Sequence, residues 1–150
     1  MIDLLRKVGI FGLIVGMLGV QACSTTPEPL RYGADACHSC KMTLVDNRFG
    51  AELVTRKGKI YKFDDLNCML AFYHSGEEEG DKFKHKLVVN YEKPGEFLKA
   101  AEAFYLKSKE IRSPMASEVA AFESYDRAIY FKKQWSGIFL AWGEIITQFK

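Results

Sequence analysis

An internal repeat most constrains what this chain can fold into, because its two halves show the same order of strand, strand, helix and strand. In the first half, the segments with these patterns are 51–56, 60–63, 66–75 and 85–91. In the second half, they are 103–106, 119–122, 125–135 and 138–141. β-Branched and aromatic runs joined by a turn with glycine are typical of hairpins, and apolar residues at helical spacing are typical of amphipathic helices. The sequence therefore predicts an α+β fold of duplicated ββαβ units with small mixed or antiparallel sheets.

The junction between the second strand and the helix is also repeated. Phe63 ends a strand directly before Asp64 and Asp65, just as Phe122 ends a strand shortly before Ser124. Aspartate and serine are preferred helix N-caps, so a helix is expected to begin directly after each pair of residues. Two short segments outside the repeat are also expected to be helical: 96–101 and 144–149.

The N-terminus has the pattern of a bacterial lipoprotein signal. Arg6 and Lys7 precede an uncharged run over 8–20, which has the length of a signal-peptide core and is too short to span a bilayer comfortably. The run closes with Gln21 and the small residue Ala22 directly before Cys23, which is expected to carry the lipid. The predicted divisions are a lipoprotein signal peptide at 1–22, a lipidated tether over 23–35 and one domain over 36–150.

Lipidation of Cys23 would hold the protein body outside the cytoplasm, anchored to the periplasmic or cell-surface side of a bacterial membrane. An ordinary secretory signal or an uncleaved anchor is the alternative. Without residues 1–22, the chain carries 19 basic and 18 acidic side chains. This near-neutral balance does not predict nucleic-acid binding, which calls for a clustered basic face.

Three thiols remain beside the lipidated one, at Cys37, Cys40 and Cys68. An odd number allows at most one disulfide within the chain, so at least one thiol stays free. In the segment CHSCKM, Met42 follows Cys40 by two residues and Cys37 by five, and thiolate and thioether ligands together favour Cu(I). Met115 lies in a predicted loop after Pro114, where a core role explains a methionine less easily.

Other interpretations of these residues remain open. Cys37 and Cys40 could form a redox-active or structural disulfide, or help to clasp zinc. His38 lies between the two cysteines and is expected to point away from them more often than toward them. Cys68 could be a buried small hydrophobic residue instead of a ligand, and Met69, about 100° further around the helix, is expected to lie in the core.

Taken together, the motifs resemble NosL-type proteins, the accessory lipoproteins associated with nitrous oxide reductase. The resemblance rests on the lipoprotein signal, CxxCxM at 37–42, GAELVTRKGKIYKFDDLNCMLAFY at 50–73 and SPM at 113–115. It implies a duplicated ββαβ fold and a copper-binding domain over 36–150. The residues that it implies at a Cu(I) site are Cys37, Cys40, Met42, Cys68 and Met115. The chain departs from the family pattern at Lys41 and Ala116, where the family often has glycine.

The resemblance further implies a metallochaperone, not an enzyme, that hands Cu(I) by ligand exchange to a copper enzyme. Nitrous oxide reductase or its maturation machinery is the expected recipient, and the lipid anchor would confine both partners to one membrane surface. Two other classes of function remain in play: a thiol–disulfide redox protein that uses the CxxC segment, and a structural lipoprotein whose cysteines only close a loop.

Overall fold

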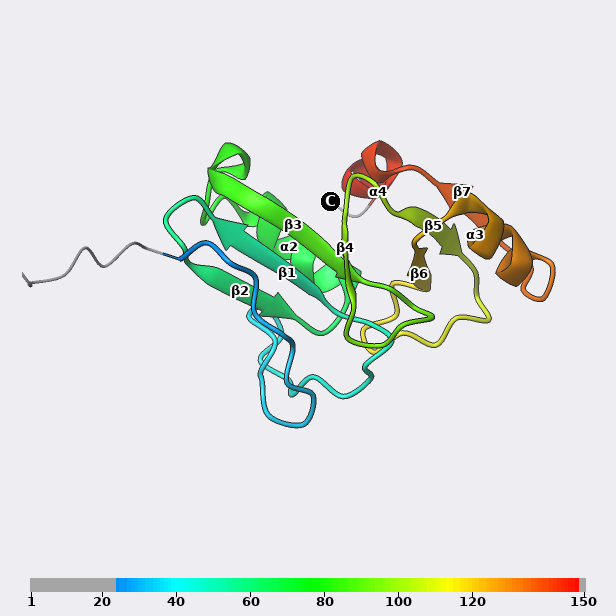
Figure 1. Ribbon diagram of the computed structural model, residues 1–150, viewed down its shortest axis with the longest axis horizontal. Helices are drawn as coiled ribbons and strands as arrows, with labels where there is room; N and C mark the ends of the chain where they lie inside the picture. Colours follow the sequence, from blue (N-terminus) through cyan, green and yellow to red (C-terminus); the bar gives the residue numbers. More distant parts are fainter. Residues whose placement is uncertain (1–23, 149–150) are drawn as a thin grey trace, which may run out of the picture.

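The repeat predicted from the sequence is confirmed as two small antiparallel sheets, each with its own helix (Figure 1). The computed structural model describes residues 24–148, so the predicted signal peptide and Cys23 lie outside the described residues. The first sheet has the strand order β2-β1-β3-β4, and the second has the order β6-β5-β7. The strands are β1 (Ala51–Thr55), β2 (Ile60–Phe63), β3 (Phe83–Val89), β4 (Phe97–Lys99), β5 (Phe104–Lys107), β6 (Val119–Phe122) and β7 (Ile138–Leu140).

Helices α2 (Leu66–Ser75) and α3 (Tyr125–Lys132) begin where the repeated junction predicts. Helix α4 (Trp142–Gln148) begins two residues before the segment 144–149 that was expected to be helical, and a short 3-10 turn, η1 (Gly80–Lys82), precedes β3. The Asp65 side chain accepts a hydrogen bond from the Leu66 N–H, and the Ser124 side chain accepts one from the Arg127 N–H. Gly76 then ends α2 in the left-handed region at φ 78°. Within residues 24–148, no helix is long and apolar enough to cross a bilayer.

Pairing within each sheet follows one scheme, because the first strand of each unit lies between its hairpin partner and the strand after the helix. Thus β1 pairs with β2 and β3, and β5 pairs with β6 and β7, all antiparallel. The helix predicted at 96–101 is wrong, since this segment contains strand β4. Leu98 lies opposite Val88, and this pairing with β3 overrides the local helical pattern.

Strand β1 is buried along its whole length because both of its faces are covered. Helix α2 lies behind the sheet, and the segment from residue 24 onward passes in front of it (Figure 1). That segment has no helix or strand up to residue 31, yet Leu30 is buried and the Glu28 N–H donates to Glu52 Oε1 over 3.1 Å. Burial raises the pKa of Glu52 to about 7. Lys62 bonds to Asp35 at 2.8 Å, which ties the segment before the CHSCKM loop to β2.

The second sheet joins the two units because it is packed on both faces. Leu106 and Phe122 belong to a cluster with Ala128 of α3, whereas Tyr105 and Ala121 belong to the main core with the first unit. The Tyr91 N–H also donates to the Ala121 carbonyl across the two sheets at 2.9 Å. Loops of the second unit are thereby held beside the amino-terminal end of α2.

Candidate metal centre

The CHSCKM segment forms a tight loop between Ala36 and Thr43, which pair as an isolated antiparallel bridge. The Cys37 N–H donates to the Met42 carbonyl at 2.8 Å, and the Lys41 N–H donates back to the Cys37 carbonyl at 3.0 Å. Closing so short a loop places Lys41 in the left-handed region, at φ 64°. The two cysteines therefore lie on a turn and not at the start of a helix, as a thioredoxin-like motif would require.

Two hydrogen bonds fix this loop against the rest of the body. The His38 N–H donates to the Lys62 carbonyl of β2 at 2.7 Å, and Ser39 Oγ donates to the Cys68 carbonyl of α2 at 2.7 Å. The His38 ring packs edge-on against Tyr61 and Phe72, with centroids 4.7 and 4.9 Å away. His38 therefore packs against aromatic side chains, and it does not belong to the candidate metal-binding group of Cys37, Cys40 and Cys68.

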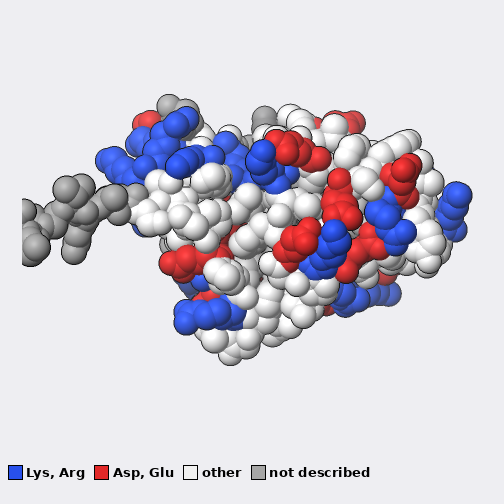
Figure 2. Space-filling view, in the orientation of Figure 1, with Lys and Arg blue, Asp and Glu red and all other residues white. Residues whose placement is uncertain are grey.

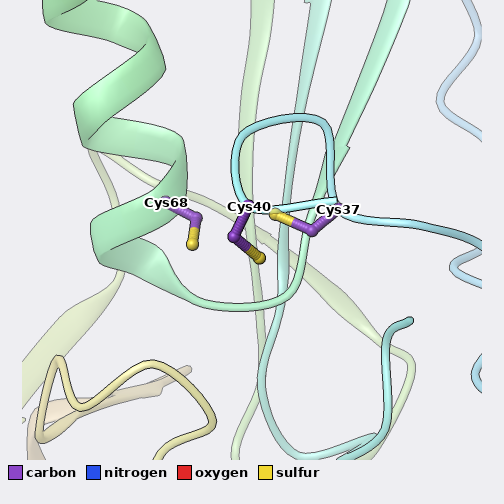
Figure 3. Close-up of side chains that lie close together, drawn as sticks. All are labelled: Cys37, Cys40 and Cys68. Atoms are coloured by element: carbon purple, nitrogen blue, oxygen red, sulfur yellow. The ribbon is translucent and has the colours of Figure 1, made fainter. Parts of the chain in front are cut away.

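The loop and α2 bring three sulfur atoms together (Figure 3). The Sγ atoms of Cys37, Cys40 and Cys68 all lie within 4.8 Å of one another. Thiolate–metal bonds of about 2.3 Å place the sulfurs of one site about 4 Å apart, so little movement separates this arrangement from a three-thiolate site. Cys37 and Cys68 are buried, whereas Cys40 is partly exposed. The three thiols could therefore hold one metal ion that solvent reaches from the side of Cys40.

Met69 and Cys68 are both buried in the main core cluster, and the Cys68 sulfur also lies with those of Cys37 and Cys40. The two side chains point in different directions because consecutive residues of a helix are offset by about 100°. Cys68 is therefore a buried residue that is also placed as a candidate ligand.

Hydrogen bonds among the thiols favour one negative charge on Cys37. The Cys68 thiol donates to Cys37, and the backbone N–H groups of Asp64 and Cys40 also donate to it; together they hold the pKa of Cys37 well below its usual range against the opposing effect of burial. The hydrogen bond to Cys37 and burial raise the pKa of Cys68. All three cysteines are free. A soft cation would therefore meet one thiolate already formed and would displace the proton of Cys68.

The loop that carries Met115 is attached to the start of α2 by Asp65. Asp65 Oδ2 accepts hydrogen bonds from the N–H groups of Met115 at 2.9 Å and Ser117 at 3.2 Å, while Oδ1 caps α2. The Asn67 side chain donates to the Met115 carbonyl. Met115 is partly buried against the same core cluster as Cys40 and Cys68. The structure thus places the Met115 loop at the helix turn that carries Cys68.

The predicted site residues therefore fall into three groups. Cys37, Cys40 and Cys68 form one cluster, and Met115 lies in a loop bonded to the first turn of α2. The Met42 side chain is 58% exposed on the CHSCKM loop. The sequence suggested Asp65 as a helix cap. The hydrogen bonds from the Met115 loop to Asp65 were not predicted, because no local sequence pattern indicates a partner fifty residues away.

A comparison with known families identifies this arrangement. The NosL family model matches residues 32–149, which contain all three clustered cysteines and Met115. The chain belongs to the NosL family. Its fold is similar to that of the crystal structure of the copper chaperone NosL from Shewanella denitrificans, with a TM-score of 0.68 at 20% sequence identity. That match covers 81% of this chain and 96% of the other chain. No curated protein sequence matches the chain.

Lys41 and Ala116, where the resemblance predicts glycine, both have left-handed backbone. Lys41 has φ 64° in the CHSCKM loop, and Ala116 has φ 57° in the loop that carries Met115. This conformation costs a residue with a Cβ about 1–2 kcal/mol, whereas glycine adopts it freely. A glycine at either position would therefore relieve the strain of the left-handed backbone.

Replacing Ala116 with glycine should raise the free energy of unfolding by roughly 0.5–1 kcal/mol, since the relief of left-handed strain exceeds the added freedom of the unfolded chain. Urea unfolding of the reduced, metal-free protein measures this change. Ala101→Gly is the matched control, because Ala101 is exposed and does not have a positive φ. It should lower stability. A loss of stability in Ala116→Gly as well would mean that the loop is not strained.

Proposed function

We propose that this NosL chain is a lipid-anchored, extracytoplasmic Cu(I) metallochaperone that delivers copper to nitrous oxide reductase or its maturation machinery. The observation that carries the proposal is the meeting of three thiols within 4.8 Å, two of them buried and one partly exposed. Membership of the NosL family and the fold shared with a copper chaperone support it. The anchor at Cys23, the Cu(I) oxidation state and the recipient rest on the sequence resemblance.

The donor set favours Cu(I) over zinc. Structural zinc sites are closed by four cysteine or histidine ligands, and the His38 ring is packed against aromatic side chains instead. Three thiolates, with the Met115 thioether as a further ligand, form an all-sulfur set that suits a soft monovalent ion. We include Met42 as an outer ligand, because it is exposed and follows Cys40 by two residues on the same loop.

Copper transfer in this scheme is ligand exchange without redox or bond-making chemistry. Cu(I) binds to the Cys37 thiolate, to Cys40 and to Cys68, and the thiol protons displaced from Cys40 and Cys68 pass to solvent. A sulfur or imidazole of the recipient then enters from the exposed side, the Cys40–copper bond breaks first, and Cys40 and Cys68 regain protons from solvent as the ion leaves. Burial of Cys37 and Cys68 protects the ion from water, and exposure of Cys40 permits its exit.

The test is an anaerobic titration of Cu(I) into the reduced chain from Ser24 to Lys150, which retains every helix and strand described, in competition with a chromogenic chelator. We expect one Cu(I) per chain, no catalytic turnover of a test disulfide, and passage of copper from the loaded protein to metal-free nitrous oxide reductase. Disulfide turnover without copper binding would identify a redox protein. A chain that neither binds copper nor turns over the test disulfide would be a structural lipoprotein.

A further inference from the structure

Basic side chains gather at the end of the body where the described chain begins (Figure 2). A surface hollow of about 220 Å³ there is lined by Lys84, Lys86 and Lys99, together with His85 and Trp142. Burial lowers the pKa of Lys86, and the positive charge of the nearby Arg56 lowers it further. We call Lys84, Lys86 and Lys99 the basic surface.

The positive charge of this surface is only partly neutralised. Lys99 is paired with Glu102 at 2.9 Å. Among the side chains that the structure describes, no carboxylate lies within ion-pair distance of Lys84 or Lys86. Lys86 Nζ lies 5.8 Å from the centre of the Tyr73 ring. Because the chain as a whole is nearly neutral, this excess of positive charge is a local feature that attracts anions.

The basic surface also contacts the chain close in sequence to the predicted point of lipidation. Lys84 Nζ donates to Thr25 Oγ1 over 2.5 Å, and Thr25 follows Cys23 by two residues. A protein held by a lipid at Cys23 would have these lysines close to the headgroup layer. A basic patch next to an acyl anchor strengthens membrane attachment, because each lysine near an anionic membrane surface adds its own electrostatic attraction.

We propose that the basic surface docks on anionic phospholipid headgroups and orients the protein on the membrane. The inference rests on the proposed lipid anchor and deepens it. Lys86 lies over Tyr73 near the carboxyl-terminal end of α2, whereas Cys68 lies in the first turn of that helix. Docking through the lysines therefore places the amino-terminal end of α2, and the thiol cluster beside it, away from the lipid. A recipient protein reaches Cys40 on that side.

The test uses the full chain, produced with its own N-terminal segment and attached to vesicles of phosphatidylcholine alone or mixed with phosphatidylglycerol. The rate of lysine acetylation by a water-soluble reagent is measured for each lysine by mass spectrometry. On the anionic vesicles, acetylation of Lys84, Lys86 and Lys99 should slow by about fivefold or more, while exposed Lys109 and Lys133 keep their rates. Salt at about 0.5 M should abolish the difference, because it shortens the screening length to about 4 Å.

Two variants with equal net charge sharpen the result. Lys84→Gln/Lys86→Gln should remove the protection of Lys99, whereas Lys109→Gln/Lys133→Gln should leave it unchanged. Equal acetylation on both vesicle types would overturn the docking surface. Unchanged protection of Lys99 in Lys84→Gln/Lys86→Gln would also overturn it. So would a variant that loses recipient binding with no change in lipid binding, and that result would assign the surface to an acidic protein.

Failure of the lipid anchor is distinguishable from failure of the docking surface. An unanchored chain would not float with phosphatidylcholine vesicles, which would contradict the proposed anchor alone. If that chain floats with the phosphatidylglycerol vesicles, the proposed docking through the basic surface is still supported. If it floats with neither vesicle type, the proposed docking is overturned.

Discussion

Replacing Cys68 with serine should lower the affinity for Cu(I) by about 100-fold or more. Sites with four thiolate or imidazole ligands bind a metal with roughly 10–16 kcal/mol, so each ligand contributes about 3 kcal/mol, or two orders of magnitude. Cys68 is one of three thiols within 4.8 Å, and a serine hydroxyl is a hard, weakly acidic group that does not replace a thiolate toward a soft ion. The measurement is competition with a chromogenic Cu(I) chelator under anaerobic conditions.

The neighbouring residue supplies the matched control. Met69→Leu exchanges a sulfur-containing side chain for an apolar one of similar volume on the same helix, and Met69 is buried in the core. Copper affinity should stay within about twofold, because a core residue contributes packing and no ligand. Copper affinity unchanged in Cys68→Ser would show that Cys68 is a buried small residue with no part in binding.

Replacing Asp65 with alanine should lower the free energy of unfolding by about 3–4 kcal/mol. Loss of the helix cap costs about 1 kcal/mol. The part-buried Met115 N–H and the buried Ser117 N–H lose their acceptor as well, and each costs about 1–1.5 kcal/mol, at the lower end of the range for an unsatisfied donor because water reaches the first of them. Chemical denaturation of the reduced, metal-free protein measures the change. Copper affinity should also fall, since the Met115 loop loses its attachment to α2.

Ser124→Ala is the matched control for Asp65→Ala, because Ser124 caps the equivalent helix of the second unit. Its oxygen accepts the Arg127 N–H at 3.3 Å and is not bonded to a distant loop, so its loss should cost only about 1 kcal/mol. Equal losses in the two variants would show that the bonds from Asp65 to the Met115 loop add nothing to stability.

The order of elements was predictable because it is encoded locally. β-Branched and aromatic runs mark the strands, an apolar stripe marks α2, and Asp65 and Ser124 mark the two helix starts. The exception is β4, whose three residues form a strand only because the edge of β3 offers unpaired backbone groups. Segment 96–101 carries no local pattern from which that partner follows.

The residues of the thiol site were also proposed from sequence, but their arrangement was not. Cys37 and Cys40 are close because two residues separate them, and this holds in almost any conformation of the loop. Cys68 joins them only because α2 packs against β1 and β2 with its first turn beside the loop, held there by Ser39. The choice between ligand and core residue at Cys68 is therefore a matter of long-range packing.

The sequence by itself determined the duplicated α+β architecture, the helix starts and the soft character of the candidate ligands, because periodicity, capping and side-chain chemistry are properties of short segments. Only the tertiary structure decided that Cys68 faces Cys37 and Cys40, that Asp65 holds the Met115 loop, and that the basic surface lies beside Thr25. These three contacts join residues far apart in the chain. Their geometry follows from how the sheets and helices pack to bury apolar surface, which no local pattern specifies.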